Sequence, residues 1–174
     1  TIAGWAVGAN TGYIYVRSEY PEAIEALNEA IKAATAQGWL GESVLGTDFS
    51  FYIHVRVGAG SYVCGEETAL LESLEGKRGV VRAKPPLPAH VGLFGKPTVI
   101  NNVLSLGTVP AILADGAAAY AALGVGRSRG TQVLQLAGNI ARGGIFETAF
   151  GTTLGEVVND LGVGTANGRP IRTV

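Results

Sequence analysis

Hydrophobic positions in the first third of the chain follow two different periods. Tyr13–Val16 is rich in β-branched and aromatic residues, and apolar residues alternate with polar ones over Phe51–Val57, so both segments predict strands. Between them, apolar residues recur at helical spacing from Pro21, a typical first helical residue, to a stop at Gly38. A strand, a helix and a strand in this order predict a βαβ unit with a parallel pair.

The next segment combines a glycine-rich stretch, a helix and a long loop. Residues 58–65 are glycine-rich, and a helix is expected from Glu66 to about Glu75 with leucines on its apolar face. Three closely spaced prolines then exclude both helix and central strand within Lys77–Lys96. Loops of this length are uncommon in compact domains and are usually functional.

The second half of the sequence predicts shorter elements. A helix is expected over 103–113, which Pro110 would kink or divide, and another over 117–123. Two short strands and a helix follow, and Thr153 begins that helix with a capping box. The predicted organisation is an α/β domain over residues 1–124, a linker over 125–130, and the start of a small α+β module over 131–174.

Composition limits the class of protein. The 174 residues are 47% hydrophobic and 16% charged, which is enough apolar material for a core. The net charge of -1 gives no bulk attraction to nucleic acid or anionic lipid. A single cysteine, Cys64, excludes an internal disulfide and a four-cysteine metal site, and we interpret it as a small buried hydrophobe. Neither end resembles a natural terminus, so we expect a fragment of a longer protein.

The glycine-rich loop is the sharpest candidate site. Glycines let backbone N–H groups approach a ligand closely, and the start of the following helix adds partial positive charge. However, Gly58 and Gly60 are followed by Gly65, so the spacing typical of dinucleotide-binding loops is not met. A tight turn and a ligand site both fit this pattern.

Two carboxylates at the start of the helix change this interpretation. Glu66 and Glu67 complement the helix dipole, and they would repel a phosphate at the same helix end. A nucleotide bound here should therefore place ribose hydroxyls or flavin ring N–H groups near them. Its phosphates would lie instead at Thr98, Asn101 and Asn102, where a strand is expected to lead into a helix.

The long loop is basic and has two interpretations. It is either a solvated surface loop or a flap that contacts an anionic dinucleotide. Both histidines are isolated, and no catalytic triad, phosphate-binding loop or nucleic-acid motif is present. The cations of the loop are Lys77, Arg78, Arg82, Lys84 and Lys96.

Three contiguous motifs carry a family resemblance. They are residues 58–76, Lys84-Pro85-Pro86-Leu87-Pro88 and residues 95–103. On these motifs the chain resembles the NADH-binding flavoprotein subunit of respiratory complex I, the family of 51 kDa subunits, over essentially its whole length. Residues 135–170 look closest to β subunits of soluble NAD-dependent formate dehydrogenases, and diaphorase subunits of NAD-reducing hydrogenases are similar.

The resemblance implies a fold, an activity and partners. The fold is α/β, a Rossmann-like βαβ flavin- and NAD-binding domain followed by the start of a ubiquitin-like β-grasp module. The activity is hydride transfer between NAD(H) and flavin mononucleotide (FMN), with electrons passing on to iron–sulfur clusters. The ligands of the expected 4Fe-4S cluster would lie beyond Val174, so no metal ligand is expected here. The partners would be iron–sulfur and catalytic subunits of a cytoplasmic dehydrogenase, without nucleic acid or membrane insertion.

The resemblance also assigns roles to residues. Gly65 and Glu66 would lie against the flavin ring, whereas Tyr62, Glu67 and Lys84 would face the nicotinamide dinucleotide. Glu67 is the catalytic candidate. The cofactor-binding candidates also include Gly58 and Gly60 of the loop, with Thr98, Ile100, Asn101 and Asn102 at the ribityl-phosphate end.

One departure and two alternatives remain. Many relatives have Phe where this chain has Leu87, and Leu lacks an aromatic stacking contribution of about 0.5–1.5 kcal/mol. A redox-inactive scaffold that keeps only the fold, and a small-ligand-binding β-grasp protein, are the alternative functions. The preference for NAD or NADP stays open. We expect the 174 residues alone to bind flavin weakly and to be inactive, because the family's upstream flavin loop is absent from this sequence.

Overall fold

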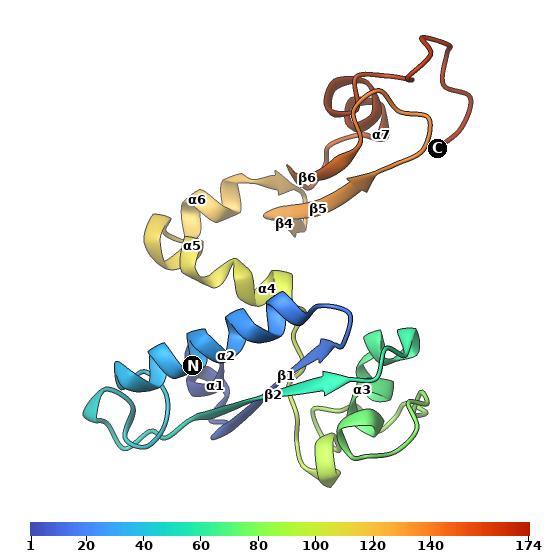
Figure 1. Cartoon of the computed structure of the whole chain (residues 1–174). Helices are drawn as coiled ribbons and strands as arrows, with labels where there is room; N and C mark the ends of the chain where they lie inside the picture. The colour runs from blue at the N-terminus through green and yellow to red at the C-terminus, as the bar shows by residue number, and fades with distance from the viewer. The chain divides into compact units, whose positions relative to one another are not determined.

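The computed structural model describes residues 1–174, which form two compact units, Thr1–Asn101 and Asn102–Val174 (Figure 1). The chain mixes helices with three two-stranded sheets. The expected mixture of helix and sheet is therefore confirmed, whereas the Rossmann-like and β-grasp assignments stay predictions.

The first unit contains the predicted βαβ arrangement. Strand β1 (Thr11–Arg17) leads into helix α2 (Pro21–Ala36), and β2 (Tyr52–Gly58) then pairs parallel to β1 (Figure 1). The register runs from Thr11 opposite Tyr52 to Arg17 opposite Gly58, so the carboxyl ends of both strands lie at one edge. Open parallel sheets bind their ligands at this edge.

The core of the first unit lies where α2 meets the start of β2. Leu40, Val44 and Phe51 are buried, and Ile31 and Ile53 pack against them. The apolar positions of both predicted periods therefore meet in one cluster. A short helix, α1 (Ile2–Val7), ends at Gly8, which has a left-handed backbone conformation.

Helix α3 (Glu67–Leu74) follows the glycine-rich stretch and one tight turn over Tyr62–Gly65. Glu66 is its N-cap rather than its first residue. The leucine face predicted for this helix is only partly correct. Leu71 is buried, but Thr68 and Ala69 complete the buried face, because the helix packs through its first turn. Cys64 is buried, as predicted.

The loop over residues 77–96 contains no strand, as predicted, and is interrupted by two turns, one at residues 88–90 and one at Leu93–Gly95. In the second unit, the helix predicted over 103–113 is divided, as expected, into α4 (Val103–Gly107) and α5 (Val109–Asp115), but the break lies at Thr108 and not at Pro110. Pro110 lies in the first turn of α5, where a missing N–H costs no hydrogen bond. Helix α6 (Ala117–Ala122) follows.

The segment predicted as a linker has local structure of its own. Strands β3 (Gly124–Val125) and β4 (Ser128–Arg129) form a tight antiparallel hairpin. In the sequence, the first compact unit ends at Asn101 and the second begins at Asn102. The predicted domain limits around residues 125–130 stay predictions.

The rest of the second unit has the predicted order of two strands and a helix. Strands β5 (Thr131–Leu136) and β6 (Gly144–Ala149) are antiparallel. Helix α7 (Leu154–Glu156) begins with the predicted capping box between Thr153 and Glu156. It continues as a wider helical turn over Val157–Leu161, which buries its first two valines.

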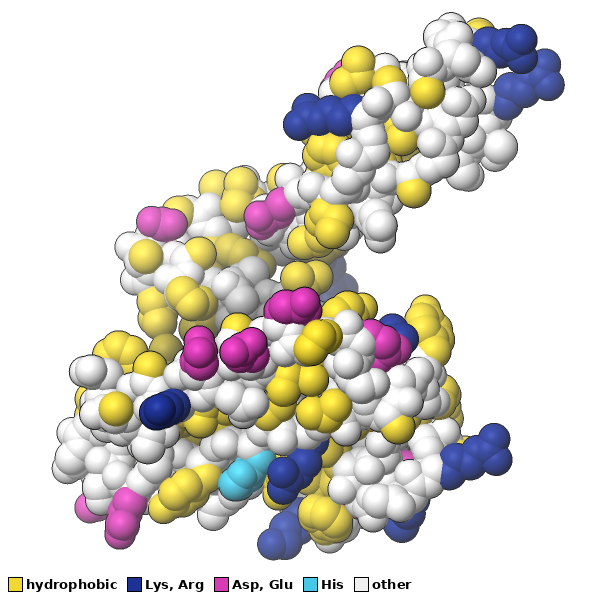
Figure 2. Space-filling view, viewed as in Figure 1, with side chains coloured by type: hydrophobic (Ala, Val, Ile, Leu, Met, Phe, Trp, Pro, Cys, Tyr) yellow, Lys and Arg dark blue, Asp and Glu magenta, His cyan; other side chains and the backbone are white.

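Hydrophobic side chains reach the surface in both units (Figure 2). In the first unit they include Trp5, which is 68% exposed, and Tyr62, which is 89% exposed. No helix of the chain has both the length and the apolar character needed to cross a lipid bilayer.

Candidate functional site

The glycine-rich loop begins at the carboxyl end of β2, and its first glycine has a packing role. Gly58 is buried, and a Cβ atom there would lie 2.3 Å from the hydroxyl oxygen of Tyr15. That hydroxyl shares a hydrogen bond of 2.9 Å with Ser73 on α3. Close approach of Tyr15 therefore explains Gly58 without a ligand. Gly60 has a φ of 83°, so its backbone conformation explains this second glycine.

Gly65 has neither of these reasons to be glycine. It is exposed, its φ is outside the left-handed region, and a Cβ atom there would meet no atom within 4 Å apart from those of the local backbone and its chain neighbours. Tyr62, in the same turn, is 89% exposed. The surface in front of Gly65 is therefore open, and a ligand that approaches the backbone closely would supply the missing reason for this glycine.

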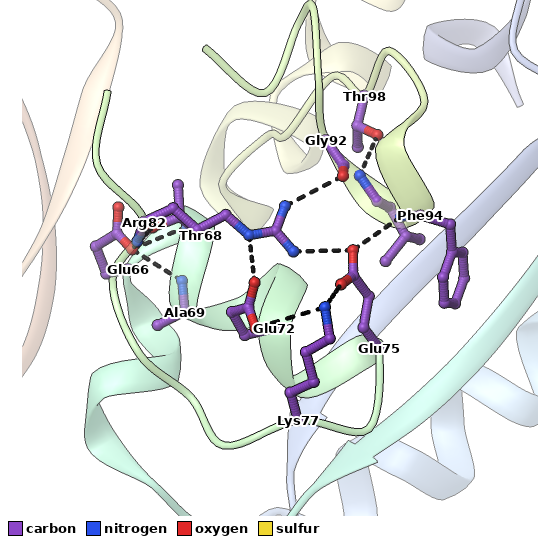
Figure 3. Close-up of polar contacts among 11 residues, drawn as sticks. Glu66, Thr68, Ala69, Glu72, Glu75, Lys77, Arg82, Gly92, Phe94 and Thr98 are labelled. Carbon is purple, nitrogen blue, oxygen red and sulfur yellow. Dashed lines mark hydrogen bonds and ion pairs between the residues drawn. The ribbon is translucent and has the colours of Figure 1, made fainter. Parts of the chain in front are cut away.

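Glu66 divides its two oxygens between the helix and the open surface. Oε2 accepts hydrogen bonds from the N–H groups of Thr68 and Ala69, at 2.8 and 2.9 Å, and from the Thr68 hydroxyl at 2.6 Å (Figure 3). The hydrogen bond from the Thr68 hydroxyl, with help from the Ala69 N–H group, lowers the pKa of Glu66 to about 2. The side chain is therefore ionised at neutral pH, and Oε1 remains outside the helix cap.

Lys84 lies between the two carboxylates at the start of α3. Its Nζ donates to Oε1 of Glu66 at 3.2 Å and to Oε1 of Glu67. The hydrogen bond to Glu67 is the main cause that raises the pKa of Lys84. Three of the predicted site residues thus form one cluster, in which one cation faces two carboxylates.

Other cations of the long loop are paired within the first unit (Figure 3). Arg82 contacts Glu72 at 2.5 Å and Glu75 at 2.8 Å, and Lys77 contacts Glu75 at 2.8 Å. Hydrogen bonds from Lys77 and then Arg82 lower the pKa of Glu75 to about 2. The loop is therefore not a fully solvated surface loop, and its contact with a dinucleotide stays a prediction. Lys77 and Arg82 anchor it to α3.

The Thr98 hydroxyl forms hydrogen bonds with the end of the long loop. Its hydroxyl accepts a hydrogen bond from the N–H of Leu93 and donates one to the carbonyl oxygen of Lys96, both at 2.9 Å. These bonds hold the turn at Leu93–Gly95 in place. A role for Thr98 toward a phosphate stays a prediction.

Asn102 caps α4. Its Oδ1 accepts a hydrogen bond of 2.9 Å from the N–H of Leu104, and its side-chain NH2 group donates to no residue of the chain. Asn101 is exposed and Ile100 is half-buried. Both asparagines thus have donors available at the start of a helix. The strand expected to lead into this helix is absent, because residues 97–102 form no regular secondary structure.

Thr68 is a site residue that the sequence pattern did not predict. This side chain is 1% exposed, and its hydroxyl donates to Glu66 and accepts from the N–H of Arg82 at 2.8 Å. A threonine two residues after an N-cap glutamate was the available signal, but the contact with Arg82 joins residues 14 positions apart. The structure contains no group of three or more His, Cys, Asp or Glu side chains that could hold a metal ion.

Comparison with known proteins gives consistent matches. Residues 1–111 match the family model of the Nuo51 FMN-binding domain. The HndC subunit of the NADP-reducing hydrogenase of Solidesulfovibrio fructosivorans is 46% identical over 173 residues, which cover 99% of this chain and 35% of that protein. An NADH-quinone oxidoreductase subunit of Rhizobium meliloti (strain 1021) is 44% identical over 99% of this chain and 41% of its own length.

The fold is also similar to a solved structure. The crystal structure of an NAD+-reducing NiFe hydrogenase in the H2-reduced state matches with a TM-score of 0.81 and 38% identity. The match covers 95% of this chain and 27% of that chain. The chain spans about two fifths or less of the length of the curated relatives described above. It belongs to the Nuo51 FMN-binding domain family, the 51 kDa flavoprotein family that its motifs resemble.

Proposed function

We propose that this chain supplies part of the FMN- and NAD(H)-binding site of an NADH:acceptor oxidoreductase subunit. The observation that carries the proposal is the open surface at Gly65, where a glycine has no reason in packing or backbone conformation. This surface lies next in sequence to the cluster of Glu66, Glu67 and Lys84. An apolar ring with N–H groups at its edge fits an exposed glycine backbone beside a carboxylate.

Gly65 and Glu66 would hold the flavin ring. Oε2 of Glu66 is fixed by the helix, so Oε1 has a defined position from which to accept a hydrogen bond from a ring N–H group. The low pKa of Glu66 keeps it an acceptor throughout the physiological range. When bound, FMN takes a hydride from NADH and passes electrons on singly.

The FMN phosphate would lie away from these carboxylates. Glu66 and Glu67 outnumber their one cation, so a phosphate beside them would be repelled. We assign the ribityl-phosphate end to Ile100, Asn101 and Asn102. The unpaired NH2 group of Asn102 is a donor of the kind that phosphate oxygens require.

Tyr62, Glu67 and Lys84 would face the nicotinamide dinucleotide. The exposed ring of Tyr62 offers a stacking surface, and the carboxylate of Glu67 would accept hydrogen bonds from ribose hydroxyls. Lys84 would hold Glu67 in place and reduce the repulsion of the anionic dinucleotide. Glu67 is our catalytic candidate because it would orient the hydride donor.

The proposal extends to the rest of the protein by similarity. The relatives are named as subunits of NADH-quinone oxidoreductase and of hydrogenases, and we infer iron–sulfur and catalytic partner subunits in the cytoplasm. We assign the βαβ unit to a Rossmann-like domain and residues 131–174 to a β-grasp module. The closer likeness to formate dehydrogenases stays a prediction, as does a 4Fe-4S cluster held by residues beyond Val174.

Anaerobic addition of NADH to the FMN-loaded protein tests the proposal. A polypeptide that contains this chain and matches the relatives in length should show bleaching of its visible flavin band. Glu67→Gln should bleach more slowly, because the hydride donor is oriented less well, whereas Glu147→Gln on β6 serves as the charge-matched control. Stoichiometric FMN that NADH does not bleach would show that the chain keeps the cofactor site without the activity.

A further inference from the structure

The guanidinium group of Arg82 ties the Pro-rich loop (residues 77–96) to the last turn and C-cap of α3, and also to a later residue of the loop itself (Figure 3). It contacts Glu72 at 2.5 Å and Glu75 at 2.8 Å, and it donates to the carbonyl oxygen of Gly92 at 3.1 Å. The Glu75 side chain is only 8% exposed, so this pair is largely shielded from water. The planar fork of arginine serves these acceptors together, which the single ammonium group of lysine does less well.

The backbone of Arg82 reaches the candidate site by a second path. Its N–H donates to the buried hydroxyl of Thr68 at 2.8 Å, and that hydroxyl donates to Oε2 of Glu66 at 2.6 Å. Lys84, two residues further along, contacts Oε1 of Glu66 and the carboxylate of Glu67. Oε1 of Glu66 therefore contacts Lys84 directly, and Oε2 is linked to the backbone of Arg82 through the Thr68 hydroxyl.

We infer that Arg82 is a positioning residue, which anchors the loop on α3 so that Lys84, Glu66 and Glu67 keep the arrangement that faces NAD(H). This inference rests on the proposed function. Arg82 does not bind the dinucleotide itself, because Glu72, Glu75 and Gly92 already occupy its guanidinium group. Without this anchor, the loop would keep its backbone contact with Thr68 but would lose the restraint on Lys84.

Steady-state kinetics of the FMN-loaded, full-length protein test the inference. Arg82→Gln should raise the KM for NADH about tenfold, which corresponds to about 1.4 kcal/mol, while kcat and FMN content change little. Arg82→Lys should lie between this variant and the wild type. Arg127→Gln removes the same charge from the exposed turn of the β3–β4 hairpin and should leave KM unchanged. In the double variant Arg82→Gln with Lys84→Gln, the change in binding free energy calculated from KM should be much smaller than the sum of the changes in the two single variants. Both substitutions act through Lys84.

Limited trypsin digestion gives a readout that does not depend on activity. Cleavage after Arg78, in the same loop, should be faster in Arg82→Gln than in the wild type and in Arg127→Gln. Where Arg82→Gln loses FMN or fails to fold, Glu72→Gln removes a single partner and should shift KM and cleavage in the same direction.

The outcomes separate this inference from the proposed function. A wild-type protein that does not oxidise NADH would overturn both. A wild type that is active, with a KM in Arg82→Gln and Glu72→Gln equal to that of the wild type, would overturn the positioning role alone. Additive effects of Arg82→Gln and Lys84→Gln on KM would do the same, because Arg82 would then act independently of Lys84.

Discussion

Three glycines lie at the end of β2 and in the loop that follows, and each position is glycine for a different structural reason. The sequence showed three glycines in one loop and could not rank them. Gly58 accommodates the ring of Tyr15, Gly60 has a left-handed backbone, and Gly65 lies on open surface. The first cause depends on a residue on the neighbouring strand, which no local pattern reveals. Only Gly65 therefore points to a ligand.

Alanine substitutions should distinguish these glycines by stability. Gly58→Ala should lower the free energy of unfolding by about 1–3 kcal/mol, because its Cβ would overlap a tyrosine held by Ser73. Gly65→Ala should leave the free energy of unfolding unchanged, since its Cβ would meet no atom beyond the local backbone and its chain neighbours. Urea unfolding of both variants provides the measurement. A large loss in Gly65→Ala would mean that this glycine has a structural role.

Leu87 is half exposed in the Pro-rich loop, where the resemblance places a contact with the base of NAD(H). Leu87→Phe should strengthen NADH binding by about 0.5–1.5 kcal/mol, or roughly two- to tenfold, because an aromatic ring stacks on adenine. The KM for NADH at constant kcat is the measure, and Leu87→Ile serves as the non-aromatic control. An equal KM in all three proteins would place the base elsewhere.

Elements were predictable where their signal is local. The hydrophobic period predicted the two parallel strands and α2, the prolines predicted the loop, and Thr153 predicted the capping box of α7. The structure confirms each of these elements. The exact face of α3 was not predictable. Its buried Thr68 depends on a hydrogen bond to Arg82 across the loop, and such tertiary contacts leave no periodic signal.

The hydrogen bonds of Glu66 in the cap of α3 and the ion pairs of Glu75 with the loop should make the first unit sensitive to acid. Glu66 and Glu75 have pKa values lowered from the usual 4.5 to about 2 in the folded chain. The unfolded chain therefore takes up protons first as the pH falls. This contribution to stability is complete above about pH 5 and is lost progressively toward pH 2. The free energy of unfolding should fall over that range.

Glu75→Gln should flatten this pH profile and should lower stability at neutral pH, because Arg82 and Lys77 lose a charged partner. Urea unfolding at several pH values gives the profile. Glu29→Gln on α2, where the glutamate is exposed and forms no ion pair, is the matched control. Profiles of equal slope in Glu75→Gln and the wild type would show that the lowered pKa of Glu75 does not contribute to stability.

At the scale of the whole molecule, the family was predictable from three contiguous motifs, and the comparisons confirm it. The boundary between the two units was harder to predict from the sequence. It depends on which residues contact one another in the folded chain and not on composition. The relatives are more than twice as long as this chain. We therefore expect the 174 residues alone to bind FMN far more weakly than a polypeptide of the relatives' length, which a visible titration of both would measure.

An FMN titration of three proteins of full family length tests the central claim most directly: the wild type, Gly65→Ala, and Gly155→Ala as a glycine control on α7. The visible flavin spectrum reports binding, and urea unfolding reports stability. We predict saturable, stoichiometric binding by the wild type and Gly155→Ala, and greatly weakened binding by Gly65→Ala with unchanged stability. Binding of FMN by Gly65→Ala with the affinity of the wild type would contradict a flavin site at Gly65 and Glu66.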